Sequence, residues 1–253
     1  VLMMFKNKLK VAVPSSPSSF VSSNIPSKNP FSYQSKLFFV QNKTDEAKNG
    51  GVDFNIFFPM DIHMNNELLQ HLLITCSIIE KELYNILRID HKLIYSISVK
   101  YATYYYGTVV EITGSCTDTN VVKIFKCIIE YLREKKIKHV DQKLVNNFKK
   151  LLLLYRQNNI KNPMEIAEFY ESQYILNELQ KRYRSRRIKP QQEKEQTKPY
   201  KACKIYSETE FDKILEPVSA KHIQKIINMM DFSSIIIGYM GKKNLDLNLS
   251  DFI

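Results

Sequence analysis

The sequence contains no run of about 18 apolar residues, the length that a helix needs to cross a bilayer. Its apolar runs, such as Leu151–Tyr155 and Ile235–Ile237, have the size of core segments. These residues therefore exclude a transmembrane helix on length. Hydrophobic residues make up 44% of the chain and charged residues 25%, which is typical of a folded protein and not of a disordered one. With 253 residues the chain can bury a core as one large domain or two small ones.

Cysteine is scarce and follows no pattern. The four cysteines, Cys76, Cys116, Cys127 and Cys203, form no Cys-x-x-Cys pair. Zinc clusters and disulfide frameworks need cysteines at close or repeated spacing, so this distribution favours buried or free thiols in a reducing intracellular compartment. The compartment stays open, because the basic, serine-rich and acid-free residues 1–20 would also suit transport into a mitochondrion or another organelle.

The amino end has no signal-peptide core, because lysines interrupt its short apolar patch. Residues 14–30 are rich in proline and serine and are typical of a linker. We therefore expect residues 1–30 to be a disordered leader or linker, residues 31–241 to form a single domain, and residues 242–253 to be a tail.

Positive charge is concentrated in one segment. The formal net charge is +11, and residues 181–204 carry ten Lys or Arg against two Glu, a net of +8 that leaves +3 for the rest of the chain. A flexible basic insert can bind nucleic acid phosphates, anionic lipid or an acidic partner. It shares no pattern with a known nucleic-acid module, so we interpret it as a solvated loop and do not expect nucleic acid as a partner. The candidate anion-binding residues are Lys181, Arg182, Arg184, Arg186, Arg187 and Lys189.

Strand and helix patterns follow one another without strict alternation. Period-two runs rich in β-branched and aromatic residues predict strands, and apolar residues at helical spacing predict helices. The predicted strands are 34–41, 52–58, 93–101, 107–114 and 233–239, and the predicted helices are 65–88, 119–133, 141–155, 163–179, 208–215 and one capped by Ser219. This order indicates an α+β fold: a two-layer sandwich in which a mostly antiparallel or mixed sheet of five or six strands is covered by a layer of long helices.

One stretch, Leu83–Ser98 ("LYNILRIDHKLIYSIS"), joins the first long helix to the third strand. Arg88 lies at the end of the helix, where a cation is favoured, and Tyr95 lies just inside the strand, where tyrosine is favoured. The stretch follows a longer pattern, Leu-x-x-x-Leu-Arg, then six residues, then Tyr-Ser-hydrophobic-Ser.

This pattern resembles the arginine and tyrosine motif in the non-catalytic, C-terminal-type domain of the pitrilysin/insulinase zinc peptidases, the inverzincins, which include the mitochondrial processing peptidases. A second phrase typical of that domain is met by Val218–Ile223, and the strand that follows closes at Gly238. The order of elements agrees over roughly residues 31–241, apart from the basic insert. The resemblance implies a metallopeptidase fold of the LuxS and processing-peptidase type.

The resemblance also implies a role for Arg88 and Tyr95. In the family, these residues reach a catalytic domain, hold substrate and help to stabilise the tetrahedral intermediate. A guanidinium offers several fixed donors to a peptide carbonyl, and a phenol can hydrogen-bond a developing oxyanion. Arg88 and Tyr95 are therefore the predicted substrate-binding residues. Lys92 stands where the family commonly has glycine, so we expect a different turn geometry before Tyr95.

No catalytic residue and no metal ligand is predicted in this chain alone. Inverzincins bind zinc through His-x-x-Glu-His on the first long helix. Here the corresponding string is "HLLIT", in which Ile74 and Thr75 replace the glutamate and the second histidine that should follow His71. His63, Glu67 and His71 are spaced by four, and we interpret them as a solvated polar stripe. We expect no cofactor on this chain and zinc on a partner domain.

The leading hypothesis from the resemblance is an inactive, zinc-less half of a peptidase. Such a half binds peptide substrate and assists a homologous catalytic domain or subunit that carries His-x-x-Glu-His. An alternative is a non-catalytic structural or assembly homologue of the same fold, such as the core subunits of a respiratory complex. A third hypothesis, from another class, is an anion-binding or nucleic-acid-binding module that uses residues 181–204 on an inert scaffold.

Overall fold

The computed structural model describes residues 35–42, 51–60, 66–104, 107–159 and 207–252, together with part of 163–178. The chain divides into two units, Val1–Pro30 and Phe31–Ile253, and every described residue belongs to the second unit. The expected leader (1–30) and the basic insert (181–204) lie outside the described residues.

The described elements follow the predicted order. They are β1 (Lys36–Gln41), β2 (Gly51–Met60), α1 (Asn66–Tyr84), a π-helical turn (Asn85–Asp90), β3 (Ile94–Tyr104), β4 (Gly107–Thr117), α2 (Val121–Ile137), α3 (Gln142–Asn159), α5 (Glu208–Leu215), α6 (Ala220–Met229) and β5 (Ile236–Gly241). Short 3₁₀ turns precede α2 and β5 and follow β5.

The five strands form one mixed sheet in the order β1-β5-β2-β4-β3. β1 runs parallel to β5, and the other neighbouring strands are antiparallel. The last strand therefore lies between the first two, which follow one another in the sequence but do not pair. Burial alternates along β5, where Ile237 and Tyr239 are buried and Ile236 and Gly238 are half-buried. The predicted α+β sandwich with a mixed sheet is confirmed.

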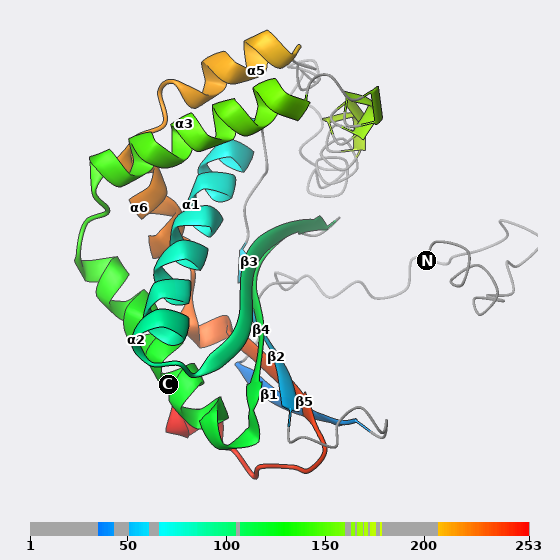
Figure 1. Ribbon diagram of the computed structural model, residues 1–253, viewed down its shortest axis with the longest axis vertical. Helices are drawn as coiled ribbons and strands as arrows, with labels where there is room; N and C mark the ends of the chain where they lie inside the picture. Colours follow the sequence, from blue (N-terminus) through cyan, green and yellow to red (C-terminus); the bar gives the residue numbers. More distant parts are fainter. Residues whose placement is uncertain are drawn as a thin grey trace, which may run out of the picture. The chain divides into compact units, whose positions relative to one another are not determined.

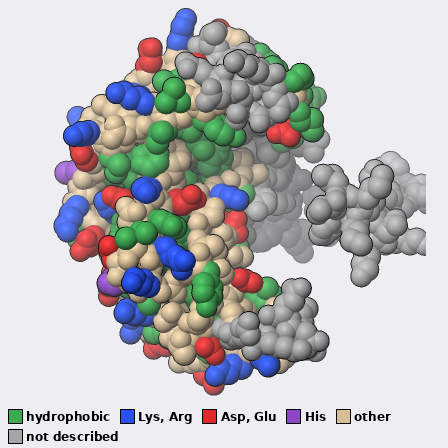
Figure 2. Space-filling view, in the orientation of Figure 1, with side chains coloured by type: hydrophobic (Ala, Val, Ile, Leu, Met, Phe, Trp, Pro, Cys, Tyr) green, Lys and Arg blue, Asp and Glu red, His purple; other side chains and the backbone are tan. Residues whose placement is uncertain are grey.

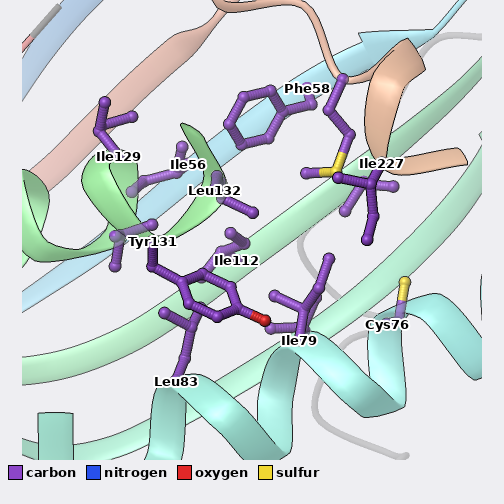
Figure 3. Close-up of a cluster of buried hydrophobic side chains, with 14 of the residues drawn as sticks. Ile56, Phe58, Cys76, Ile79, Leu83, Ile112, Ile129, Tyr131, Leu132 and Ile227 are labelled. Atoms are coloured by element: carbon purple, nitrogen blue, oxygen red, sulfur yellow. The ribbon is translucent and has the colours of Figure 1, made fainter. Parts of the chain in front are cut away.

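The helices lie on one side of the sheet (Figure 1). Their apolar stripes meet the inner side chains of β2 and β4, such as Phe54, Ile56 and Ile112, which are almost fully buried. Tyr131 of α2 points its hydroxyl toward α1 (Figure 3) and donates to Glu82 at 2.5 Å. Lys135 pairs with the same carboxylate at 2.8 Å, so α1 and α2 are joined by a polar contact at the margin of the core.

Several element boundaries differ from the sequence prediction. The long helix does not continue regularly to Arg88, because its last six residues form the π-helical turn. Ser233 and Ser234 belong to a 3₁₀ turn and not to the final strand, since the Asp231 carboxylate accepts from the Ser233 N–H at 2.9 Å and fixes a turn there. The segment 242–253, expected to be a tail, includes Phe252, which is buried edge-on against Phe125.

Cys76, Cys116 and Cys127 are free thiols, and the first two of them are buried. Burial raises the pKa of the Cys76 thiol to about 12, with a smaller contribution from Glu80. The pKa of Cys116 is also raised to about 12, by burial and by Asp53 and Asp118. Both buried thiols therefore stay protonated at neutral pH and are poor nucleophiles.

Within the described residues, none of the helices combines the length and the apolar content that a membrane span needs.

Candidate functional site

The predicted site lies in the connection between α1 and β3, which includes the π-helical turn Asn85–Asp90. Leu87 and Leu93 are both buried, and the Leu93 N–H donates to the Leu87 carbonyl at 2.7 Å. This bond runs back six positions, one more than the 6→1 bond of a Schellman helix ending, in keeping with the π-helical last turn. As in a Schellman ending, the residue before the donor takes the left-handed conformation, because Lys92 has a φ of 54°. Lys92 thus adopts the backbone geometry that glycine favours. The expectation of a turn that differs from the family's stays a prediction.

Replacing Lys92 with glycine is expected to stabilise the fold. A residue with a Cβ loses roughly 1–2 kcal/mol in the left-handed region, whereas glycine loses about 0.5–1 kcal/mol of chain entropy on folding. We therefore expect a net gain of about 0.5–1 kcal/mol in the free energy of unfolding, measured by urea denaturation. Asp246, with φ of 50°, gives a matched control because aspartate tolerates this conformation better. An equal or smaller gain for Lys92→Gly than for Asp246→Gly would contradict the strain assigned to Lys92.

β3 begins with a β-bulge centred on Tyr95. Ile94 pairs with Cys116 and Ser96 pairs with Ser115, so Tyr95 is an extra residue without a register partner in the described ladder. The bulge changes which face of the sheet the side chains of β3 point to. Ile94 and Val99 are five positions apart and would point to opposite faces of a regular strand, yet both are buried under the helices. One extra residue shifts the alternation and lets both side chains reach the core.

The bulge presents Tyr95 to solvent. Its side chain is 62% exposed, and the neighbouring Ser96 hydroxyl lies 2.8 Å from the Ser115 hydroxyl of β4 on the outer surface. Among the described residues, no helix covers this face of the sheet (Figure 1).

Arg88 is held beside the same bulge. One terminal nitrogen of its guanidinium (Nη1) donates to the Ile94 carbonyl at 2.6 Å, immediately before Tyr95. The hydrogen bond places the Arg88 guanidinium, from the π-helical turn after α1, at the residue that precedes Tyr95 in the bulge of β3. A guanidinium and an exposed phenol can each donate to a peptide carbonyl or an oxyanion.

The helix-free face continues away from the bulge in two parts. Polar side chains follow β2, β4 and β3, where Asn55, Thr113 and Ser98 stand in one cross-strand row. At the other margin, β1 exposes Phe38 by 50% and Val40 by 57%. An extended peptide can find both hydrogen-bonding and apolar contacts on such a face.

The outer edge of β3 is partly occupied. The backbone N–H of Val99 donates to the Glu80 carboxylate of α1 at 2.7 Å. Strand edges that are left unpaired invite pairing with another chain, and a carboxylate at this position prevents it locally. Addition of a peptide strand along β3 would have to displace Glu80.

The zinc string of the family is replaced by core residues. Ile74 and Thr75, which stand in the positions of the glutamate and the second histidine, are fully buried, and the Thr75 hydroxyl donates back to the His71 carbonyl at 2.7 Å. Across the part of the chain that the structure describes, no three His, Cys, Asp or Glu side chains lie close enough to share a metal ion. His63 and the side chain of Glu67 lie outside the described residues.

His71 packs against α6 instead of forming a solvated stripe. Its ring stacks on the ring of His222, with centroids 4.5 Å apart and an angle of 6° between the planes. The Nδ1 atom of His222 accepts from the Ser219 N–H at 3.2 Å and so caps α6. Burial lowers the pKa of His71 to about 4, helped by His222 and Lys225. His71 is therefore neutral at pH 7.

Stability should fall as the pH is lowered past neutrality, because His71 has a lower pKa folded (about 4) than unfolded (6.5). The unfolded state binds more protons between these values, so the contribution of neutral His71 is complete above about pH 6.5 and is lost toward pH 4. The partly exposed site is screened, so we expect on the order of 1–2 kcal/mol. His71→Gln should remove this part of the pH dependence, measured by urea unfolding at several pH values. The same pH dependence in wild type and variant would contradict the assignment.

The basic residues 181–204 lie outside the described residues, so the anion-binding prediction stays a prediction. On the face shown in Figure 2, Lys and Arg side chains of the described surface are interspersed with Asp and Glu.

Sequence reasoning missed three residues that build the site. Glu80 covers the edge of β3, the Ser115 hydroxyl meets that of Ser96, and Gly114 leaves room for the bulge. The odd spacing between the apolar residues Ile94 and Val99 was the available signal for a bulge. The partners on α1 and β4 depend on long-range pairing and left no local signal.

The sequence matches the family of the Peptidase M16 inactive domain over residues 14–152, a little more than half of the 253-residue chain. The chain belongs to this family, which confirms the expected non-catalytic domain of pitrilysin/insulinase type. A comparison with curated proteins gives no match.

Solved structures of proteases share the fold. The periplasmic protease PqqL from Escherichia coli aligns with a TM-score of 0.60 at 10% identity, over 83% of this chain and 21% of that protein. A protease from Helicobacter pylori aligns with a TM-score of 0.61 at 11% identity, over 87% of this chain and 48% of that one. The peptidase M16 inactive domain from Pseudomonas fluorescens aligns with a TM-score of 0.54 at 9% identity, over 85% of this chain and 45% of that one. The chain thus spans between a fifth and a half of the length of these proteins.

Proposed function

We propose that this chain is the zinc-less half of a two-part peptidase, which binds an extended peptide and assists a homologous catalytic half that carries His-x-x-Glu-His. The observation that supports this role most directly is the bulge of β3, which exposes Tyr95 directly after the carbonyl to which Arg88 donates. Membership of the M16 inactive-domain family is the second support.

In this proposal the two halves close around the peptide, and this half supplies groups that the catalytic half lacks. The phenol of Tyr95 donates to the oxyanion that forms when water attacks the scissile carbonyl. The polar rows of the helix-free face hold the peptide backbone, and the exposed apolar side chains of β1 take up apolar side chains of an unfolded substrate. The zinc ion and the general base belong to the partner.

The test is reconstitution. The tagged chain is used to capture partners, which are searched for an M16-type chain with His-x-x-Glu-His. That partner is then assayed on an unstructured peptide with and without this chain. We expect little turnover by either component and substantial turnover by the pair. A stable pair whose turnover equals that of the partner alone would reject the assisting role and favour a structural homologue.

A further inference from the structure

We propose that Arg88 is a positioning residue: through the hydrogen bond of its Nη1 to the Ile94 carbonyl it holds the β-bulge that presents Tyr95. This inference rests on the proposed function and refines it. The family resemblance implies that the arginine and the tyrosine both contact substrate, whereas here one nitrogen of the guanidinium binds the chain's own backbone.

The bulge needs a partner for its backbone. The inserted Tyr95 interrupts the ladder between β3 and β4, and a bulge leaves backbone groups without their usual strand partners. The Nη1 of Arg88 lies 2.6 Å from the Ile94 carbonyl, which is short for a nitrogen donor and typical of a charge-assisted hydrogen bond. The guanidinium is thereby anchored to the residue that precedes Tyr95.

The preceding turn fixes the position of Arg88. The His91 N–H donates to the Ile86 carbonyl, and buried Leu87 and Leu93 hold the helix ending against the core. Arg88 follows Leu87 directly, so its backbone cannot move far without disturbing that ending. A rigid element therefore carries the cation to the carbonyl, which is the arrangement that orients a functional side chain well.

Gly114 bounds the bulge on the other side. A Cβ on Gly114 would lie 2.7 Å from the Ser96 carbonyl oxygen, so the backbone of the bulge approaches β4 as closely as a glycine allows. The bulge lies between Gly114 and Arg88. On its outer surface, the Ser96 hydroxyl forms a hydrogen bond with the Ser115 hydroxyl of β4. Without the guanidinium, the Ile94 carbonyl loses this charged hydrogen bond and the bulge that carries Tyr95 is held less firmly.

The first test needs no activity. Amide hydrogen exchange is measured on the full chain for the wild type, Arg88→Ala and Arg133→Ala, which removes an exposed arginine from α2 as a control. We expect exchange at residues 94–97 and 114–116 to rise about tenfold or more in Arg88→Ala alone, from loss of a charged hydrogen bond. Arg88→Lys keeps the charge without the planar fork, so its exchange rate at these residues should lie between those of the wild type and Arg88→Ala. Unchanged exchange in Arg88→Ala would overturn the proposal.

The second test is a double-mutant cycle on turnover by the reconstituted pair. If Arg88 acts through Tyr95, Arg88→Ala lowers kcat with little change in KM, and adding it to Tyr95→Phe causes little further loss. If the losses of kcat from Arg88→Ala and Tyr95→Phe multiply in the double variant, or if Arg88→Ala raises KM alone, Arg88 binds peptide directly and the proposal is overturned. If no pair has peptidase activity, the proposed function fails, while the exchange measurement still decides whether Arg88 holds the bulge.

Discussion

Tyr95→Phe is expected to lower kcat/KM of the reconstituted pair by about 10²–10³-fold, the loss typical when one donor to an oxyanion is removed. The change deletes one hydroxyl from a side chain that is 62% exposed, so it leaves the packing of the core untouched. Because the hydrogen bond forms with the transition state, kcat and kcat/KM should fall together while KM stays nearly constant.

The matched control is Tyr155→Phe. Tyr155 lies on α3, is 65% exposed, and loses the same atom in the same substitution. We expect its kcat/KM to stay within about twofold of the wild type, and both variants to keep the wild-type melting temperature. Equal turnover of Tyr95→Phe and Tyr155→Phe would contradict the role of Tyr95 as a donor to the oxyanion.

Gly114→Ala is expected to destabilise the fold by about 3 kcal/mol, at the upper end for overpacking in a core. The added Cβ would lie 2.5 Å from the Phe54 Cζ atom and 2.7 Å from the Ser96 carbonyl oxygen. Phe54 is itself packed edge-on against Phe125, with ring centroids 5.6 Å apart, so its ring has little room to retreat. The Ser96 carbonyl belongs to the bulge, and moving it means breaking the register of β3 with β4.

Gly238→Ala serves as the control for Gly114→Ala. Gly238 lies in the middle of β5, and the nearest atom to its added Cβ is the Asn55 carbonyl oxygen at 4.0 Å. Alanine fits there and restricts the unfolded chain, so we expect a change within about 0.5 kcal/mol or a small gain. Urea denaturation of both variants measures the difference. Equal stability of the two variants would contradict the close approach assigned to Gly114.

Local signals in the sequence predicted the elements well where the structure depends on neighbours in the chain. The bounds of α5 match because Ser207 and Glu210 form a capping box, which is readable as a Ser-x-x-Glu string. The start of α6 after Ser219 was predicted for a similar reason, although the reciprocal partner is His222. The apolar stripes of α1 and α2 likewise identified the faces that pack on the sheet.

Features that depend on distant residues could not be predicted in this way. The place of β5 between β1 and β2 joins residues about two hundred positions apart, which no local pattern specifies. Arg88 and Tyr95 were identified from a resemblance, but the hydrogen bond from Arg88 to the Ile94 carbonyl needed the geometry of the bulge. The π-helical turn was also not predicted, since neither residue composition nor spacing marks it.

Site-specific photo-crosslinking tests whether Tyr95 contacts the bound peptide. A benzophenone amino acid is placed at position 95 or, as a control of equal exposure, at position 155, and the reconstituted pair is illuminated with a labelled peptide bound. We expect a crosslink between the peptide and position 95 and none from position 155. Labelling from both positions alike, or from neither while the peptide is bound, would contradict a role for Tyr95 in contacting substrate.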